Sequence, residues 1–209
     1  MFEHGIVILD WLGIIVFAMT GALVASRNQM DAVGFVMLGT VTGIGGGTIR
    51  DLLLDIHPIL WIDQPAYLLL CAAVSLVAFF TAHLLQSRHR WILWLDAIGL
   101  ALFAATGAER AISVGAHPVV AVVMGIITAC FGGIIRDVLS RERSIIFSHE
   151  IYFTAALVAA ATYVAANAVG LPRELALSAG IVLGFTLRGG GLLFNWSLPR
   201  YRPRGPRQP

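Results

Sequence analysis

Apolar residues gather into seven long stretches along the chain, separated by short polar segments. Each stretch holds about twenty mostly apolar residues, the length that a helix needs to cross roughly 30 Å of hydrocarbon at about 1.5 Å per residue. The pattern therefore predicts seven transmembrane helices, of which the second and fifth contain several glycines. They cover Ile6 to Ala25, Ala32 to Leu53, Ala66 to Leu85, Trp91 to Ala111, Pro118 to Leu139, Ile151 to Val169 and Leu175 to Trp196.

The chain contains an internal duplication. The segment Leu9 to Leu53 aligns with Leu95 to Leu139 at a constant offset of 86 residues and without a gap. Self-similarity of this kind marks a repeated structural unit. Many of the identical positions hold small or charged residues, which do not replace one another as freely as aliphatic residues do. The identities include Asp10/Asp96, Gly13/Gly99, Phe17/Phe103, Thr20-Gly21-Ala22/Thr106-Gly107-Ala108, Gly39/Gly125 and Gly46-Gly47-x-Ile49-Arg50-Asp51/Gly132-Gly133-x-Ile135-Arg136-Asp137.

Each copy holds three predicted helices, and an odd number makes the second copy enter the membrane from the opposite side. The sequence thus predicts an all-α membrane protein of seven transmembrane helices, built as two inverted three-helix repeats plus a seventh helix. The expected boundaries are 1–90 for the first repeat, 91–172 for the second, 173–197 for the seventh helix and 198–209 for a disordered polybasic tail. Inverted repeats are a hallmark of transporters and channels.

Composition supports the membrane assignment. The chain is 58% hydrophobic and 12% charged, with a mean hydropathy of +0.83, whereas roughly a quarter of the residues in soluble domains are charged. Phosphate-binding loops, nucleophile elbows and paired carboxylates are missing from the sequence, and its histidines lack metal-ligand spacing. We expect no enzyme, no cofactor, no bound structural metal and no nucleic-acid partner.

Arginine placement predicts the orientation, because all 14 basic residues are arginines. With the N-terminus outside, only Arg110 and Arg173 lie in outer segments, and the cytoplasmic segments hold most of the others. We expect a multi-pass protein of the cell inner membrane with a cytoplasmic C-terminus. The basic tail 198–209 is expected either to contact anionic lipid headgroups or to act only as a topology signal.

The second helix of each repeat carries the strongest functional pattern. Small residues recur at every fourth position and are followed by an arginine: Gly39, Gly43, Gly47 and Arg50 in the first copy, and Gly125, Ala129, Gly133 and Arg136 in the second. Residues at this spacing share one helical face. Two interpretations stay open at this point. The face either lets helices pack closely or forms a smooth groove that lines a pathway.

The glycine runs and the arginines favour a pathway. Gly45-Gly46-Gly47 and Gly132-Gly133 predict a break or hinge, since each glycine in a helix costs up to about 1 kcal/mol relative to alanine. Burying a guanidinium costs at least about 2.5 kcal/mol in membrane insertion, and Arg50 and Arg136 occupy symmetric positions. The alternative for both arginines is snorkelling to the interface or fixed pairing with Asp10 and Asp96.

Acidic and hydroxyl side chains supply further pore-lining or partner groups. Asp10 and Asp96 are the candidates for attracting cations or for partnering the arginines across the pseudo-axis. Asp51 and Asp137 point about 100° away from the preceding arginine on a helix, so we expect them to cap, pair laterally or meet headgroups. Thr20 and Thr106 add hydroxyls, which bond either to a pore occupant or to their own helix.

Three residues in apolar helices have no counterpart in the other copy. Arg188 precedes Gly189-Gly190-Gly191 in the unpaired seventh helix, where we predict a packing or lipid-facing hinge. Cys71 and Cys130 are predicted to be buried small hydrophobic residues without redox chemistry.

The duplicated block Gly45 to Asp51 and its copy Phe131 to Asp137, in a chain of about 200 residues with seven spans, resembles the prokaryotic branch of the trimeric intracellular cation channel family. The resemblance covers essentially Ile6 to Trp196. It implies a homotrimer in which each subunit has its own hourglass pore for monovalent cations, chiefly K⁺ with Na⁺ also expected. Kinked second and fifth helices would surround that pore.

The same resemblance assigns roles to individual residues. Its glycine hinges map to Gly45, Gly46, Gly47, Gly132 and Gly133, and the basic residues that follow them map to Arg50 and Arg136. Phe131 replaces the first hinge glycine in the second copy, which predicts a stiffer hinge. The lysine-containing motif of the animal members is absent, so their lipid and calcium regulation is not implied.

Two other functions remain compatible with the sequence. The bacterial family includes members implicated in glycine uptake, and a transporter would use the inverted repeats for alternating access while binding a carboxylate and an ammonium group near Arg50 or Arg136. A structural or scaffolding role is the third possibility.

Overall fold

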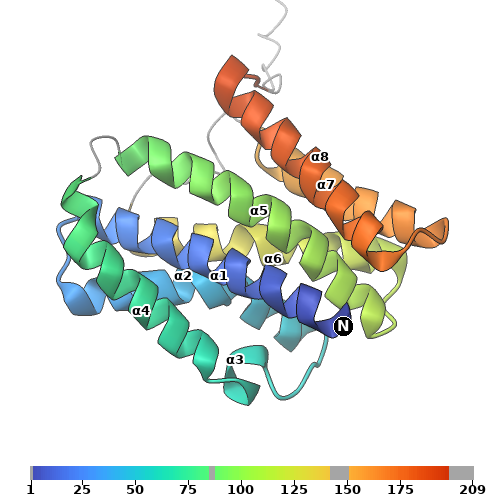
Figure 1. Ribbon diagram of the computed structural model, residues 1–209, viewed down its shortest axis with the longest axis horizontal. Coiled ribbons are helices and arrows are strands. Elements are labelled where there is room, and N and C mark those ends of the chain that lie inside the picture. The colour runs from blue at the N-terminus through green and yellow to red at the C-terminus, as the bar shows by residue number, and fades with distance from the viewer. Residues whose placement is uncertain (1, 85–87, 142–150, 198–209) are drawn as a thin grey trace, which may run out of the picture.

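The computed structural model describes residues 2–84, 88–141 and 151–197 of the 209-residue chain, so the predicted tail at 198–209 lies outside the described residues. The described residues form a bundle of helices (Figure 1). These are α1 (Phe2–Arg27), α2 (Ala32–Leu53), α3 (Leu60–Asp63), α4 (Ala66–Thr81), the 3-10 helix η1 (Ala82–Leu84), α5 (Arg88–Ser113), α6 (Pro118–Leu139), α7 (Phe153–Ala168) and α8 (Arg173–Phe194).

The long helices follow the apolar stretches of the sequence. Within the described residues, six helices are long and apolar enough to cross a membrane, and α7 is a shorter apolar helix of 16 residues. Helices α2 and α6 begin and end at the residues that the apolar pattern predicted. The prediction of an all-α membrane protein is confirmed, with six long spans and one shorter apolar helix where seven full spans were expected.

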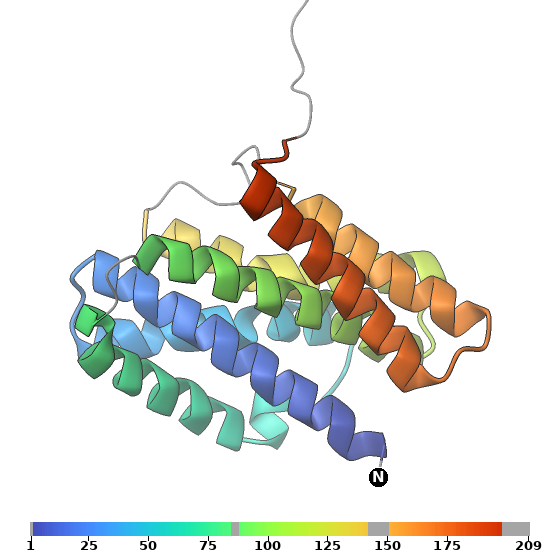
Figure 2. The same ribbon diagram turned by 45° about the horizontal axis from the view of Figure 1, so that its top comes forward.

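The two copies of the repeat lie against each other in opposite directions. Helix α1 packs beside α5, and α2 beside α6. Helix α1 begins at the end of the molecule where α5 finishes, as both views show (Figures 1 and 2). Helix α4 packs on α1 and α2, whereas α7 packs on α5 and α6. Helix α8, which has no counterpart, covers α5 and α7.

The glycine-rich helices are unbroken, which corrects the predicted interruption. Helices α2 and α6 continue through their glycine runs, and the glycines instead allow the two backbones to touch. A Cβ at Gly46 would lie less than 3.0 Å from the carbonyl oxygen of Thr128, and a Cβ at Gly132 equally close to that of Thr42. The two contacts are related by the repeat, so each copy supplies one glycine and one carbonyl.

Two aromatic rings stack near the middle of α1 and α5. The rings of Phe17 and Phe103 are repeat-equivalent, with centroids 5.2 Å apart and an interplanar angle of 24°. Each ring also lies against a glycine of the other copy, Phe103 against Gly13 and Phe17 against Gly99. Both side chains are buried, so the copies meet through apolar contact at this level.

Candidate functional site

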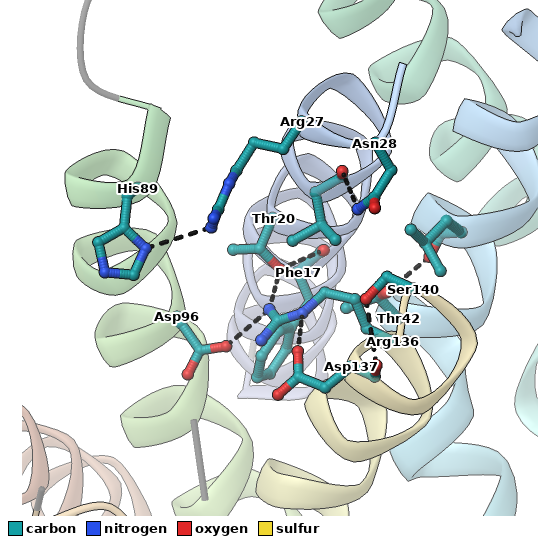
Figure 3. A network of polar contacts seen from close by, with 12 residues as sticks. Phe17, Thr20, Arg27, Asn28, Thr42, His89, Asp96, Arg136, Asp137 and Ser140 are labelled. Atoms are coloured by element: carbon teal, nitrogen blue, oxygen red, sulfur yellow. Dashed lines mark hydrogen bonds and ion pairs between the residues drawn. The ribbon is translucent and has the colours of Figure 1, made fainter. Parts of the chain in front are cut away.

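Arg136, near the end of α6, lies in a closed polar cluster. Its Nη1 donates to Oδ1 of Asp96 at 2.9 Å and to Oγ1 of Thr20 at 3.1 Å, while its Nε donates to Oδ1 of Asp137 at 2.9 Å. Figure 3 shows the guanidinium between α1, α5 and α6. The side chains of Arg136 and Asp96 are 1% and 0% exposed, so this ion pair is fully removed from solvent. Thr20 comes from the other copy, and the cluster ties the copies together.

The equivalent arginine of the first copy has a different set of partners. Arg50 donates from Nε and Nη2 to Oδ1 of Asp51, at 2.9 and 2.8 Å. Oδ2 of Asp51 accepts from the backbone N–H of Leu60, the first residue of α3. Asp51 therefore pairs laterally and caps the start of α3, two of the roles expected for it, and its lateral partner is the adjacent Arg50 although the two residues start out about 100° apart on the helix. Arg136 and Asp137 pair in the same way.

The partnership predicted between arginines and helix-start aspartates is present in one copy. Arg136 pairs with an aspartate, but with Asp96 of its own repeat, so the expected partnering across the pseudo-axis with Asp10 is wrong for this arginine. No ion pair joins Asp10 to any residue in the ranges 2–84, 88–141 and 151–197. The two copies have matching residues but different contacts.

A cavity of about 280 Å³ opens at the Arg50 end of the bundle. Four carboxylates and three guanidiniums line it: Asp10, Asp51, Asp63, Glu109, Arg50, Arg110 and Arg173. Glu109 on α5 is buried and accepts a hydrogen bond from Nη2 of Arg173, at the start of α8, whose side chain is 42% exposed. This ion pair neutralises one carboxylate of the lining and joins α8 to the wall.

A smaller cavity of about 20 Å³ lies next to the first. Both cavities share Asp10 and Arg50, and the smaller one reaches Gly43, Gly47 and Phe103. The small-residue face of α2 is divided: Gly39 packs closely against Ser75, and Gly43 lies close to Cys71, whereas Gly47 and one side of Gly43 border this hollow. Gly46 packs against α6. The Phe103 ring stacks on Phe17, and Thr20, one helical turn further along α1, belongs to the Arg136 cluster.

The two repeat-equivalent threonines differ in the same way as the arginines. Thr20 donates to its own helix, as expected for back-bonding, and also accepts from Arg136. Thr106 is 2% exposed and lines the larger cavity. Its Oγ1 has no hydrogen-bond partner within the described part of the chain. Two members of the predicted site, Thr106 and Asp10, thus border the same hollow.

Arg188 is not lipid-facing, which corrects that part of its prediction. Its side chain is fully buried, and its guanidinium lies over the ring of Tyr152 with Cζ 5.2 Å from the ring centroid. Stacking of this kind favours a cation next to the aromatic face. Arg188 therefore helps to pack α8 against the start of α7.

Sequence reasoning missed Glu109 and its ion pair with Arg173. The signal was present, because an acidic residue inside an apolar helix marks a functional or paired position. The repeat does not mark Glu109, because its counterpart in the first copy is Leu23. Helix α3, which presents Leu60 to Asp51, was also not predicted from its short sequence.

Comparison with known proteins identifies relatives along almost the whole chain. A family model described as glycine transporter matches twice, at residues 7–83 and 93–168, once for each copy of the repeat. The UPF0126 inner membrane protein YadS of Escherichia coli K12 is 38% identical over 195 residues, which cover 92% of this chain and 94% of the relative. The UPF0126 membrane protein YvgT of Bacillus subtilis is 39% identical over 200 residues, covering 92% and 94%.

Solved structures agree with these sequence matches. The trimeric intracellular cation channel orthologue of Rhodobacter sphaeroides is 56% identical, with a TM-score of 0.90 over 91% of this chain and 98% of that chain. A prokaryotic channel of the same kind, crystallised in 0.5 M KCl, is 33% identical, with a TM-score of 0.87 over 95% and 100%. The chain is a multi-pass inner-membrane protein, and it belongs to the prokaryotic branch of the trimeric intracellular cation channel family, whose family model is described as glycine transporter.

Proposed function

We propose that this chain is a channel for monovalent cations, chiefly K⁺, with a pore in each subunit between the two repeats. The observation that carries the proposal is the charged cavity at the Arg50 end, beside which a second, smaller hollow borders Gly43, Gly47 and Phe103. It contains Asp10, a carboxylate that no arginine of the described residues neutralises by direct pairing. The 56% identical structure is that of a cation channel.

In this proposal the described conformation is closed at the Arg136 end. A cation that leaves the cavity meets the stacked rings of Phe17 and Phe103 and then the Arg136 guanidinium. At an effective dielectric of about 20, a like charge 4 Å away raises the energy of a permeating cation by roughly 4 kcal/mol. Opening therefore requires that the guanidinium and the rings move from the path. Arg50 opposes entry in the same way at the other end, and Gly45 to Gly47, Gly132 and Gly133 would provide the bending.

We also propose the assembly and orientation expected from the sequence. Three chains form a homotrimer, by analogy with the trimeric relative. The Arg50 end faces outward and the Arg136 end faces the cytoplasm, which places Arg110 and Arg173 at the outer mouth and follows the arginine bias of the loops. Native mass measurement in detergent should give three chains per particle. Particles of only one or two chains would contradict the trimer.

Reconstitution in liposomes tests the transport function. Vesicles with an outward K⁺ gradient should show K⁺ efflux that depends on the protein and is absent from protein-free vesicles. The Gly46→Val variant should show less efflux than the wild type, because its side chain collides with the backbone of Thr128. Wild-type protein at normal trimer yield that passes no monovalent cation would refute the channel proposal.

Glycine transport is the second candidate, and one observation favours it beside the description of the family model. The cavity lining holds guanidiniums as well as carboxylates, so it offers partners for both ends of a small zwitterion. Labelled glycine uptake should be measured in the same vesicles as K⁺ flux. Saturable uptake without K⁺ conductance would favour the transporter, whereas K⁺ flux without uptake would favour the channel.

A further inference from the structure

The closed cluster in the second copy shows what its carboxylate and hydroxyl bind. Nη1 of Arg136 lies 2.9 Å from Asp96 Oδ1 and 3.1 Å from Thr20 Oγ1. A positively charged group thus occupies the space between an aspartate of one copy and a threonine of the other. Both oxygens are buried with their residues, so they supply a desolvated binding position for one positive charge.

The first copy has the same pair of oxygen groups without that occupant. Asp10 is equivalent to Asp96, and Thr106 is equivalent to Thr20. Asp10 and Thr106 both line the larger cavity. Arg50 directs Nε and Nη2 to Asp51 instead, and Thr106 Oγ1, on a residue that is 2% exposed, has no hydrogen-bond partner among the residues described.

We propose that Asp10 and Thr106 form a binding site for a monovalent cation, at the position that corresponds to Nη1 of Arg136 in the other copy. This inference rests on the proposed channel function, and it makes the site the first position at which an entering cation binds. Carboxylate and hydroxyl oxygens are suitable ligands for hard cations. The cation reaches them through the cavity and keeps its remaining water ligands there.

The surroundings favour a single charge. Among the other acids of the lining, Asp51 is paired with Arg50 and Glu109 with Arg173, and Asp63 lies on the short helix α3. Asp10 is the carboxylate that the repeat places with Thr106, as it places Asp96 with Thr20. One carboxylate is a poor match for Ca²⁺, which takes six to eight oxygen ligands, commonly several of them carboxylates. Arg50 is the natural competitor, because with Nε kept on Asp51 and Nη1 turned toward Asp10 and Thr106 it would have the contacts that Arg136 already has. A bound cation and the Arg50 guanidinium therefore cannot occupy this position at the same time, so cation binding opposes closure at the Arg50 end.

The first experiment locates the cation in the full-length protein. Crystals of the wild-type trimer soaked in a thallium(I) salt should show an anomalous peak within about 3 Å of both Asp10 and Thr106. The Asp10→Asn variant should lose that peak. A well-occupied wild-type peak elsewhere in the cavity, with none between these two residues, would overturn the site.

The second experiment measures the K⁺ concentration that gives half-maximal flux in liposomes. Asp10→Asn should raise it about tenfold and Thr106→Val about threefold, because a charged ligand contributes more than a neutral one. Thr186→Val is the matched control, since Thr186 is exposed on α8 and bonds only to its own helix. If both test variants conducted K⁺ with an unchanged half-saturating K⁺ concentration, the binding site would be overturned and the channel function would stand. A thallium peak at the site without flux would support the site and refute the channel.

Discussion

The contrast between the two aspartates makes a quantitative prediction about stability. Asp96 and Asp10 are repeat-equivalent, yet Asp96 pairs with Arg136 at 2.9 Å where both side chains are at most 1% exposed. Asp10 is partly exposed beside a cavity and forms no ion pair with the described residues. The same substitution, Asp→Asn, should therefore have very different effects at the two positions.

The expected magnitude follows from burial. Removing one partner of a buried ion pair costs about 3–5 kcal/mol, and Arg136 keeps Asp137 and Thr20 as partners, so we expect Asp96→Asn to cost about 3 kcal/mol. For a chain of this size each kcal/mol lowers Tm by roughly 2–4 °C, which gives a decrease of about 6–12 °C. Asp10→Asn should stay within about 1 kcal/mol, or a few degrees.

The buried cysteines provide the assay. Cys71 and Cys130 are free and buried, one in each copy, so a thiol-reactive fluorophore reports unfolding of the detergent-solubilised protein as temperature rises. Asp55→Asn is the control for loss of a surface charge, because the Asp55 side chain is 95% exposed. Equal Tm values for Asp96→Asn and Asp10→Asn would refute the reasoning, since the two clusters would then be energetically alike.

Three further predictions concern permeation and orientation. Arg50→Gln and Arg136→Gln should each raise K⁺ conductance or open probability, because a charge that repels cations is removed from the path; unchanged single-channel currents at wild-type protein levels would leave these arginines a structural role. Gly46→Val and Gly132→Val should lower conductance by forcing α2 and α6 apart, and wild-type currents from well-folded variants would contradict this. A cytoplasm-active reporter fused after Pro209 should be active, whereas activity only of a periplasmic reporter would reverse the proposed orientation.

The sequence predicted most of the architecture because its signals are local or periodic. Apolar length alone gave the bounds of α2 and α6, and the constant offset gave the repeat. The odd number of helices per copy predicted the opposite directions seen for α1 and α5. Each of these inferences depends on chain geometry and not on side-chain contacts.

The details of the site could not be predicted because they depend on how the copies cross. Gly46 and Gly47 are neighbours in a uniform motif, yet Gly46 packs on Thr128 while Gly47 borders a cavity. The way in which α2 crosses α6 decides which of the two glycines is packed and which borders the cavity. The different partners of Arg50 and Arg136 are equally invisible in two identical motifs. The Glu109–Arg173 pair near Arg50 has no equivalent in the other copy, so the two arginines also have different surroundings.

The reciprocal contact between α2 and α6 bears on the origin of the fold. Gly46 touches Thr128, and Gly132 touches Thr42, so a single three-helix copy contains both halves of its own interface. Such an isologous surface closes a two-fold dimer. Two separate three-helix chains inserted in opposite directions could therefore assemble as these copies do. The present molecule has the form of that dimer fused into one chain, and its unequal arginine clusters are what fusion permits, because the two halves no longer have to be identical.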